Sequence, residues 1–67
     1  MITIILNGEP RKLAEELDLE SLIEHFSLPH KRIAVELNNN VISRSEWGAV
    51  KVNDGDKLEV VHFVGGG

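Results

Sequence analysis

The stretch ITIILNG, residues 2–8, decides how this chain begins to fold. Its first five residues are apolar or β-branched without exception, and this composition predicts a β-strand. The Asn7-Gly8 pair that follows is the strongest short-range signal for a hairpin, because both residues tolerate a positive φ angle. The sequence therefore predicts a strand that turns back on itself at Asn7.

The residues after this turn fit two structures. A second strand through Arg11 to Leu13 would pair back on the first strand. A helix that starts at Pro10 is the alternative, because Leu13 and Leu17 are four residues apart. We favour the strand and keep the helix open.

From Asp18 the apolar residues follow the period of a helix. Asp18 is a suitable N-cap, and Pro29 is expected to end the helix, because the residue before a proline avoids the α region. The apolar residues expected on one face are Leu19, Leu22, Ile23 and Phe26. The sequence thus predicts one short amphipathic helix.

The second half of the chain predicts three more strands. Residues 33–37 read as a strand, 38–40 as a turn and 41–43 as the returning strand. Residues 53–56 form another turn signal before the last strand, 58–64. Alternation in that strand places Leu58, Val60, His62 and Val64 on one face and Glu59, Val61 and Phe63 on the other.

The order of hairpin, helix, hairpin and final strand predicts an α+β domain. We expect a mixed sheet of four to five strands with the one main helix covering one face. The last strand is expected to pair parallel to the first, with both strands central. The chain would then leave the sheet from its middle.

Composition sets limits on stability and function. A chain of 67 residues is one domain, and domains of this size bury only about 60% of their unfolded surface, so a deep catalytic cleft is not expected. The chain has no cysteine, which rules out disulfides and thiolate metal sites. Its net charge of −4 disfavours nucleic-acid binding. We found no candidate signal peptide or membrane span and expect a cytoplasmic protein.

No catalytic or metal-binding constellation is recognisable in the sequence. His25, His30 and His62 lack the spacing of convergent metal ligands, so we expect no metal site. The serines have no histidine at a spacing typical of nucleophilic catalysis. Trp47, the single tryptophan, is expected to be buried in the core rather than to form a ligand platform.

Three glycines, Gly65, Gly66 and Gly67, end the sequence and suggest a different kind of chemistry. Glycine has no Cβ, so a narrow channel in a partner can accept the backbone, and an α-carboxylate is ionised at neutral pH and can attack the α-phosphate of ATP. A frayed end or a linker is the alternative. Ordering three glycines costs on the order of 3–6 kcal/mol, so the folded body must supply docking surface. Candidates are Ile5, Val61 and Phe63, for which ordinary core packing is equally open.

Three blocks of the sequence match a known family: MITIILNGEP at residues 1–10, IAVELNNNVISRSEW at 33–47 and VNDGDKLEVVHFVGGG at 52–67. They resemble the ThiS family, the sulfur carriers of thiamine biosynthesis. The resemblance covers essentially the whole chain. Serine stands at position 43, where family members often have proline, and asparagine at 39 and 40, where they often have a glycine. The resemblance to the ThiS family implies a ubiquitin-like β-grasp domain over residues 1–64 and a flexible glycine tail over 65–67.

The resemblance also implies a reaction cycle. An E1-like adenylyltransferase (ThiF type) would use ATP and Mg to adenylylate the carboxylate of Gly67, with Gly65 and Gly66 threading into the partner. Sulfur supplied through a cysteine desulfurase would convert the adenylate to a thiocarboxylate, and thiazole synthase (ThiG type) would accept the sulfur. The chain itself would bind no cofactor and would act as a recycled co-substrate rather than an enzyme.

Other functions fit the same glycines. A sulfur carrier for molybdopterin synthesis would end in the same way, although the NNNVISRSEW block, residues 38–47, favours the thiamine branch. A ubiquitin-like modifier would form the same adenylate and then isopeptide bonds to lysines. A β-grasp module that binds partners without covalent chemistry would leave the glycines unexplained.

Overall fold

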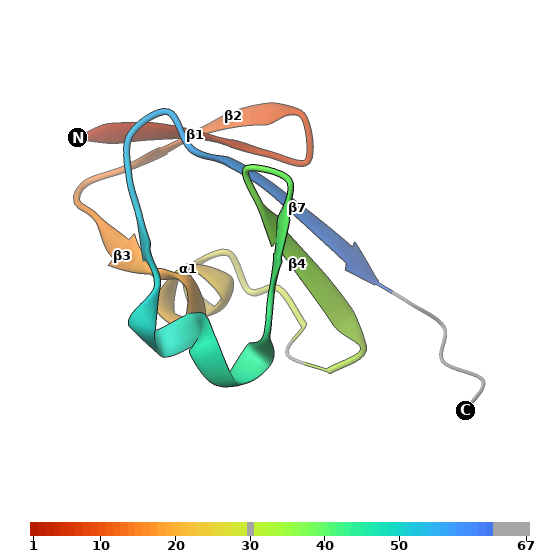
Figure 1. Ribbon diagram of the computed structural model, residues 1–67. Coiled ribbons are helices and arrows are strands. Elements are labelled where there is room, and N and C mark those ends of the chain that lie inside the picture. The colour runs from red at the N-terminus through yellow and green to blue at the C-terminus, as the bar shows by residue number, and fades with distance from the viewer. Residues whose placement is uncertain (30, 63–67) are drawn as a thin grey trace.

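The computed structural model of the chain describes residues 1–29 and 31–62, which form a mixed sheet packed against one α-helix (Figure 1). The sheet has five strands in the order β2-β1-β7-β4-β5. They are β1 (Ile2–Leu6), β2 (Glu9–Leu13), β4 (Ile33–Leu37), β5 (Asn40–Ile42) and β7 (Lys57–His62). Strand β7 is central, and it pairs parallel with β1 and antiparallel with β4. The predicted α+β architecture and the parallel pairing of first and last strands are therefore confirmed.

The first hairpin forms because two consecutive residues adopt positive φ angles. Asn7 has φ 50° and Gly8 has φ 82°, and Leu6 pairs directly with Glu9 across this two-residue turn. The strand predicted after the turn is correct and the helix alternative is wrong. Strand β2 starts at Glu9, two residues earlier than predicted, and includes Pro10, which is tolerated because β2 is an edge strand.

Helix α1 (Leu19–His25) begins as predicted and ends earlier than predicted. Asp18 caps it, with its Oδ1 accepting a hydrogen bond from the Ser21 backbone N–H at 2.8 Å. The predicted end at Pro29 is wrong, because Ser27 already adopts a left-handed φ of 56°. The N–H groups of Ser27 and Leu28 donate to the carbonyls of Glu24 and Ile23, at 3.0 and 2.9 Å. These are the two hydrogen bonds of a Schellman motif, which closes the helix before the proline is reached.

The second hairpin is also tighter than predicted. Only Asn38 and Asn39 form its turn, with φ angles of 51° and 73°, and Asn40 already belongs to β5. Leu37 pairs with Asn40, so the turn has two residues instead of the predicted three. Two consecutive positive φ angles match the twist of the flanking strands, which is why the shorter turn closes the hairpin.

The segment after β5 contains elements that the sequence did not predict. A 3₁₀ helix, η1 (Arg44–Ala49), leads to β6 (Lys51–Val52), which pairs with β3 (Leu17–Asp18) as a separate two-stranded sheet. Trp47 lies in η1, is 2% exposed and donates its Nε1–H to the Ile42 carbonyl at 3.2 Å. The prediction that Trp47 belongs to the core is confirmed.

The core lies between α1 and one face of the five-stranded sheet. All its members are apolar, and no buried polar or charged side chain occurs among the residues described here. They are Ile4, Leu6, Leu13, Leu19, Leu22, Ile23, Val35, Trp47, Val52 and Leu58. Within the described ranges, none of the helical segments has the length and apolar character needed to cross a membrane.

Candidate functional site

The site predicted from the sequence begins where β7 ends. His62 is the last described residue of β7 and pairs with Ile33 of β4. Gly65, Gly66 and Gly67, and with them Phe63 and the predicted continuation of β7 to Val64, lie outside the described residues. What the structure defines is therefore the strand that leads to the glycines.

Strand β7 is held on both sides. On the β1 side, the Asn7 N–H donates to the Leu58 carbonyl at 2.9 Å, and the Asn7 Oδ1 accepts from the Val60 N–H at 2.8 Å. On the β4 side, Asn38 donates its N–H to the Lys57 carbonyl at 2.8 Å and accepts the Lys57 N–H on its Oδ1 at 3.0 Å. Two turn asparagines thus fix the strand that precedes the predicted tail.

Val61 and Ile5, two of the predicted docking residues, lie on the sheet face turned away from α1. Their strand neighbours Leu58 and Ile4 are buried, whereas Val61 is 51% exposed and Ile5 is half-buried. Neither belongs to the core, but their role in docking remains a prediction.

The structure does not bring Ile5 and Val61 together. Ile5 pairs with Lys57, four residues before Val61, which corresponds to about 13 Å along the strand. Lys57 and Glu59 stand between them on the same face, with Lys57 Nζ 4.0 Å from Glu59 Oε1. A single continuous apolar patch of Ile5 and Val61 is therefore excluded.

Val61 adjoins Ala34 of β4 on this face, and the face continues across β4 to Val41 of β5, which sequence reasoning missed. Ala34 pairs with Val61, Glu36 pairs with Glu59, and Val41 pairs with Glu36. Val41 is 71% exposed. We call Ala34, Glu36, Val41, Glu59 and Val61 the outer patch. Strand alternation could have placed each residue on a face, but only the register shows that they adjoin.

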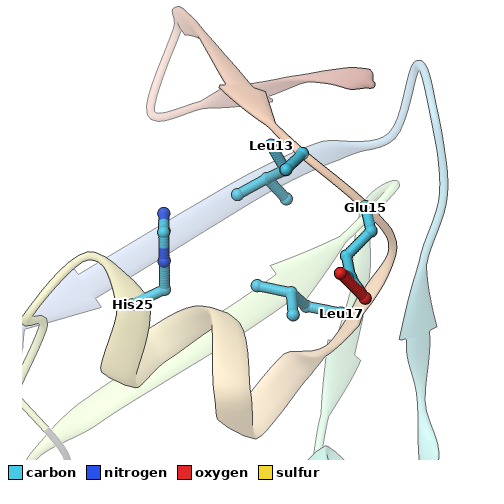
Figure 2. A pocket seen from close by; sticks show the side chains of 5 residues that line it. Leu13, Glu15, Leu17 and His25 are labelled. Atoms are coloured by element: carbon cyan, nitrogen blue, oxygen red, sulfur yellow. The ribbon is translucent and has the colours of Figure 1, made fainter.

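A cavity of about 210 Å³ lies on the other side of the molecule, between α1 and the segment joining β2 to β3 (Figure 2). Its lining is Leu13, Ala14, Glu15, Leu17 and His25. In Figure 2 the ring of His25 rises from α1 toward the sheet, and Leu13 and Leu17 supply apolar wall. The His25 ring also meets the Phe26 ring edge-on, with centroids 4.9 Å apart. Such a lining offers few convergent polar groups for catalysis.

The ionisable groups give no sign of a catalytic centre in the described part of the chain. The backbone N–H of Ser21, hydrogen-bonded to Asp18, lowers the pKa of that carboxyl below its ordinary value of 3.8, which reflects helix capping. Over residues 1–29 and 31–62, no three histidines or carboxylates gather closely enough to hold a metal ion.

Comparison with protein families identifies the chain. The model of the ThiS family matches residues 4–67. The chain belongs to the ThiS family. The resemblance inferred from the three sequence blocks is therefore confirmed.

Relatives of known structure and name agree with this assignment. The crystal structure of a thiamine biosynthesis protein (ThiS) from Geobacter metallireducens is 33% identical, with a TM-score of 0.88 over 98% of this chain and 100% of that one. The fold of this ThiS-family chain is thus the ubiquitin-like β-grasp, as the sequence predicted. The sulfur carrier protein ThiS of Bacillus subtilis is 35% identical over 92% of this chain and 96% of its own length.

A second group of relatives is much longer. Thiazole synthase of Paramagnetospirillum magneticum is 39% identical over 64 residues, which are 96% of this chain and 20% of that protein. The match to thiazole synthase of Magnetococcus marinus covers the same shares at 44% identity. The ThiS-family chain therefore spans about a fifth of these two relatives.

Proposed function

We propose that this chain is a sulfur carrier for the biosynthesis of the thiazole ring of thiamine. The observation that carries the proposal is the family match, which extends through Gly67 and so includes the three glycines. The curated sulfur carriers ThiS of similar length support it. The fold supports it as well, because the strand that leads to the glycines is central in the sheet and is held by neighbours on both sides.

The proposed chemistry takes place at the carboxylate of Gly67. A carboxylate oxygen attacks the α-phosphorus of ATP, pyrophosphate leaves, and an acyl-adenylate forms. A sulfur nucleophile then attacks the carbonyl carbon and AMP leaves. Hydrosulfide gives the thiocarboxylate directly, whereas a persulfide gives an acyl disulfide, which a thiol reductant cleaves with two electrons to leave the thiocarboxylate. Glycine favours this attack because no side chain crowds the carbonyl carbon.

Partner proteins are expected to supply the ATP site, the sulfur and the sulfur acceptor for this cycle. We expect an E1-like adenylyltransferase to bind ATP and Mg, a cysteine desulfurase to provide sulfur, and thiazole synthase to receive it. In this scheme the chain is a recycled co-substrate and not an enzyme. The cytoplasmic location expected from the sequence remains a prediction.

Intact-mass measurement of the full-length protein tests this proposal. After incubation with the cognate adenylyltransferase, ATP, Mg and sulfide, we expect the mass change of one oxygen replaced by sulfur. A variant with one residue added after Gly67 is the control and should stay unmodified. Modification of that variant would contradict the terminal-carboxylate mechanism. Isopeptide conjugates without a thiocarboxylate would assign the chain to the protein modifiers, and sulfur transfer to a molybdopterin precursor but not to thiazole synthase would assign it to the other carrier branch.

A further inference from the structure

The outer patch combines two features that are costly for an isolated domain. Val41 and Val61 are among the most exposed large apolar side chains in the described ranges, at 71% and 51%. Between them, across β4, β5 and β7, lie two carboxylates, Glu36 and Glu59. Together they form a surface that a partner with apolar groups and a cation would complement.

The two carboxylates stand directly opposite each other. Asn38 and Lys57 exchange hydrogen bonds between β4 and β7, so alternate pairs along the ladder, including Glu36 with Glu59, are also hydrogen-bonded pairs. The Cα atoms of such a pair are about 5.5 Å apart. Like charges in this position destabilise a sheet. Folding alone therefore gives no reason for two glutamates here.

The negative charge is only partly neutralised. Lys57 Nζ reaches Glu59 Oε1 at 4.0 Å, and both side chains are about half exposed, so this ion pair is weak. Glu36 has no ion pair with any residue of the described ranges. The outer patch thus presents an open anionic position between two apolar ones, which is complementary to a cation flanked by apolar groups.

The patch also lies close to the predicted tail. Val61 directly precedes His62, and the five residues 63–67 span at most about 17 Å. A protein that receives Gly67 in its active site must therefore cover surface near the end of β7. Val61, which is 51% exposed, extends the outer patch to that place.

We propose that the outer patch is the docking surface for thiazole synthase, which places an arginine or lysine side chain between Glu36 and Glu59 and apolar side chains against Val41 and Val61. The choice of partner rests on the proposed function and on the relatives named thiazole synthase, in which a stretch similar to almost this whole chain belongs to the same polypeptide. Ile5 lies outside this surface.

Calorimetric titration of the full-length chain against the thiazole synthase of the same organism tests the proposal. Glu36→Gln and Glu59→Gln should each weaken binding about tenfold or more, and each should reduce the dependence of affinity on salt. Glu16→Gln is the matched control, because Glu16 is an exposed carboxylate in the loop between β2 and β3, and it should change affinity less than twofold. Val61→Ser should also weaken binding.

Unfolding measurements separate docking from structure. Because Glu36→Gln removes a like-charge pair, its urea midpoint should equal or exceed that of the wild type while its binding falls. Loss of binding that only parallels loss of stability would overturn the proposal. Unchanged affinity for thiazole synthase in both variants would also overturn it, and so would an effect confined to the adenylyltransferase or to self-association of the chain.

The test distinguishes this inference from the proposed function. If the wild type forms a thiocarboxylate and transfers sulfur, but Glu36→Gln and Glu59→Gln bind equally well, the docking inference alone is wrong. If the wild type neither forms a thiocarboxylate nor binds thiazole synthase, the proposed function is wrong and the docking inference falls with it.

Discussion

The side chain of Asn7 accepts a hydrogen bond from the backbone N–H of Val60, 53 positions later, at 2.8 Å. Strand β1 ends at Leu6 and turns away, so no backbone carbonyl of β1 can meet Val60. The Asn7 amide oxygen takes that place, while the Asn7 backbone, at φ 50°, forms the hairpin turn. One asparagine therefore closes the first hairpin and holds the last strand close to the predicted tail.

Asn7→Gly should leave the protein about 1 kcal/mol less stable than Asn39→Gly, because both variants relax a left-handed residue and only the first removes a hydrogen bond. Glycine keeps the positive φ angle but removes the acceptor of the Val60 N–H, and a lost hydrogen bond of this type costs about 0.5–1.5 kcal/mol. Urea unfolding with an unchanged m-value measures the effect. Asn39→Gly is the control, because Asn39 has φ 73° and donates or accepts no side-chain hydrogen bond within the described ranges. An equal loss in both variants would contradict this role of Asn7.

Ser27→Gly should stabilise the protein by about 1 kcal/mol. Ser27 is the left-handed residue that ends α1, and a non-glycine residue pays about 1–2 kcal/mol for that conformation. Thermal unfolding should show a higher midpoint for the variant. Ser27→Ala keeps the strained backbone and should bring no gain. If Ser27→Ala stabilises as much as Ser27→Gly, the left-handed conformation is not the cause.

Trp47→Ala should leave the chain largely unfolded, and Trp47→Phe should cost about 1–3 kcal/mol. Truncating a buried tryptophan costs about 3–5 kcal/mol, comparable to the about 3–10 kcal/mol expected for a domain of this size. Phenylalanine retains a ring beneath Arg44, whose guanidinium lies 5.7 Å from the Trp47 ring centre, but leaves the Ile42 carbonyl without its donor. Far-UV circular dichroism is the measurement, because Trp47 is the only tryptophan. A fully folded Trp47→Ala protein would contradict the place of Trp47 in the core.

The Asp18 cap should contribute less to stability in acid. Because the pKa of folded Asp18 lies below its ordinary value of 3.8, its contribution is present above pH 3.8 and is lost as the pH falls through the folded-state pKa. Asp18→Asn keeps an N-cap that does not titrate. Urea unfolding from pH 7 to pH 3 measures the effect. As the pH falls, the wild type should lose stability relative to the Asp18→Asn variant. A difference that does not depend on pH would contradict the cap.

Local signals predicted much of the fold. The Asn7-Gly8 pair predicted a hairpin because its conformational preference acts within the turn itself, and Asp18 predicted the start of α1 for the same reason. The end of α1 was wrong because serine is not a residue that typically adopts the left-handed conformation, so nothing at Ser27 marks the stop. The pairing of β3 with β6 was missed because each strand has two residues, too few for an alternation pattern.

The sequence predicted one part of the candidate site, and only the structure revealed the other. The glycines are visible in the sequence because absence of a side chain is a property of each residue alone, and the family match through Gly67 includes them. The outer patch is not visible there, because Glu36 and Glu59 are 23 positions apart and meet only through the register of β4 with β7. Ile5 was grouped with Val61 because both are apolar, yet the register places Lys57 and Glu59 between them.

The sequence by itself determined the five strands of the main sheet, the α-helix with its cap, the positions of the two asparagine turns and the family, because each depends on short-range preference or on a match residue by residue. Only the tertiary structure decided which residues adjoin on the outer face and how Asn7 holds β7. It also decided that the indole N–H of Trp47 donates to the Ile42 carbonyl. The contacts of Asn7 with Val60 and of Glu36 with Glu59 join residues far apart in the chain, and strand register rather than any neighbour in sequence selects these partners.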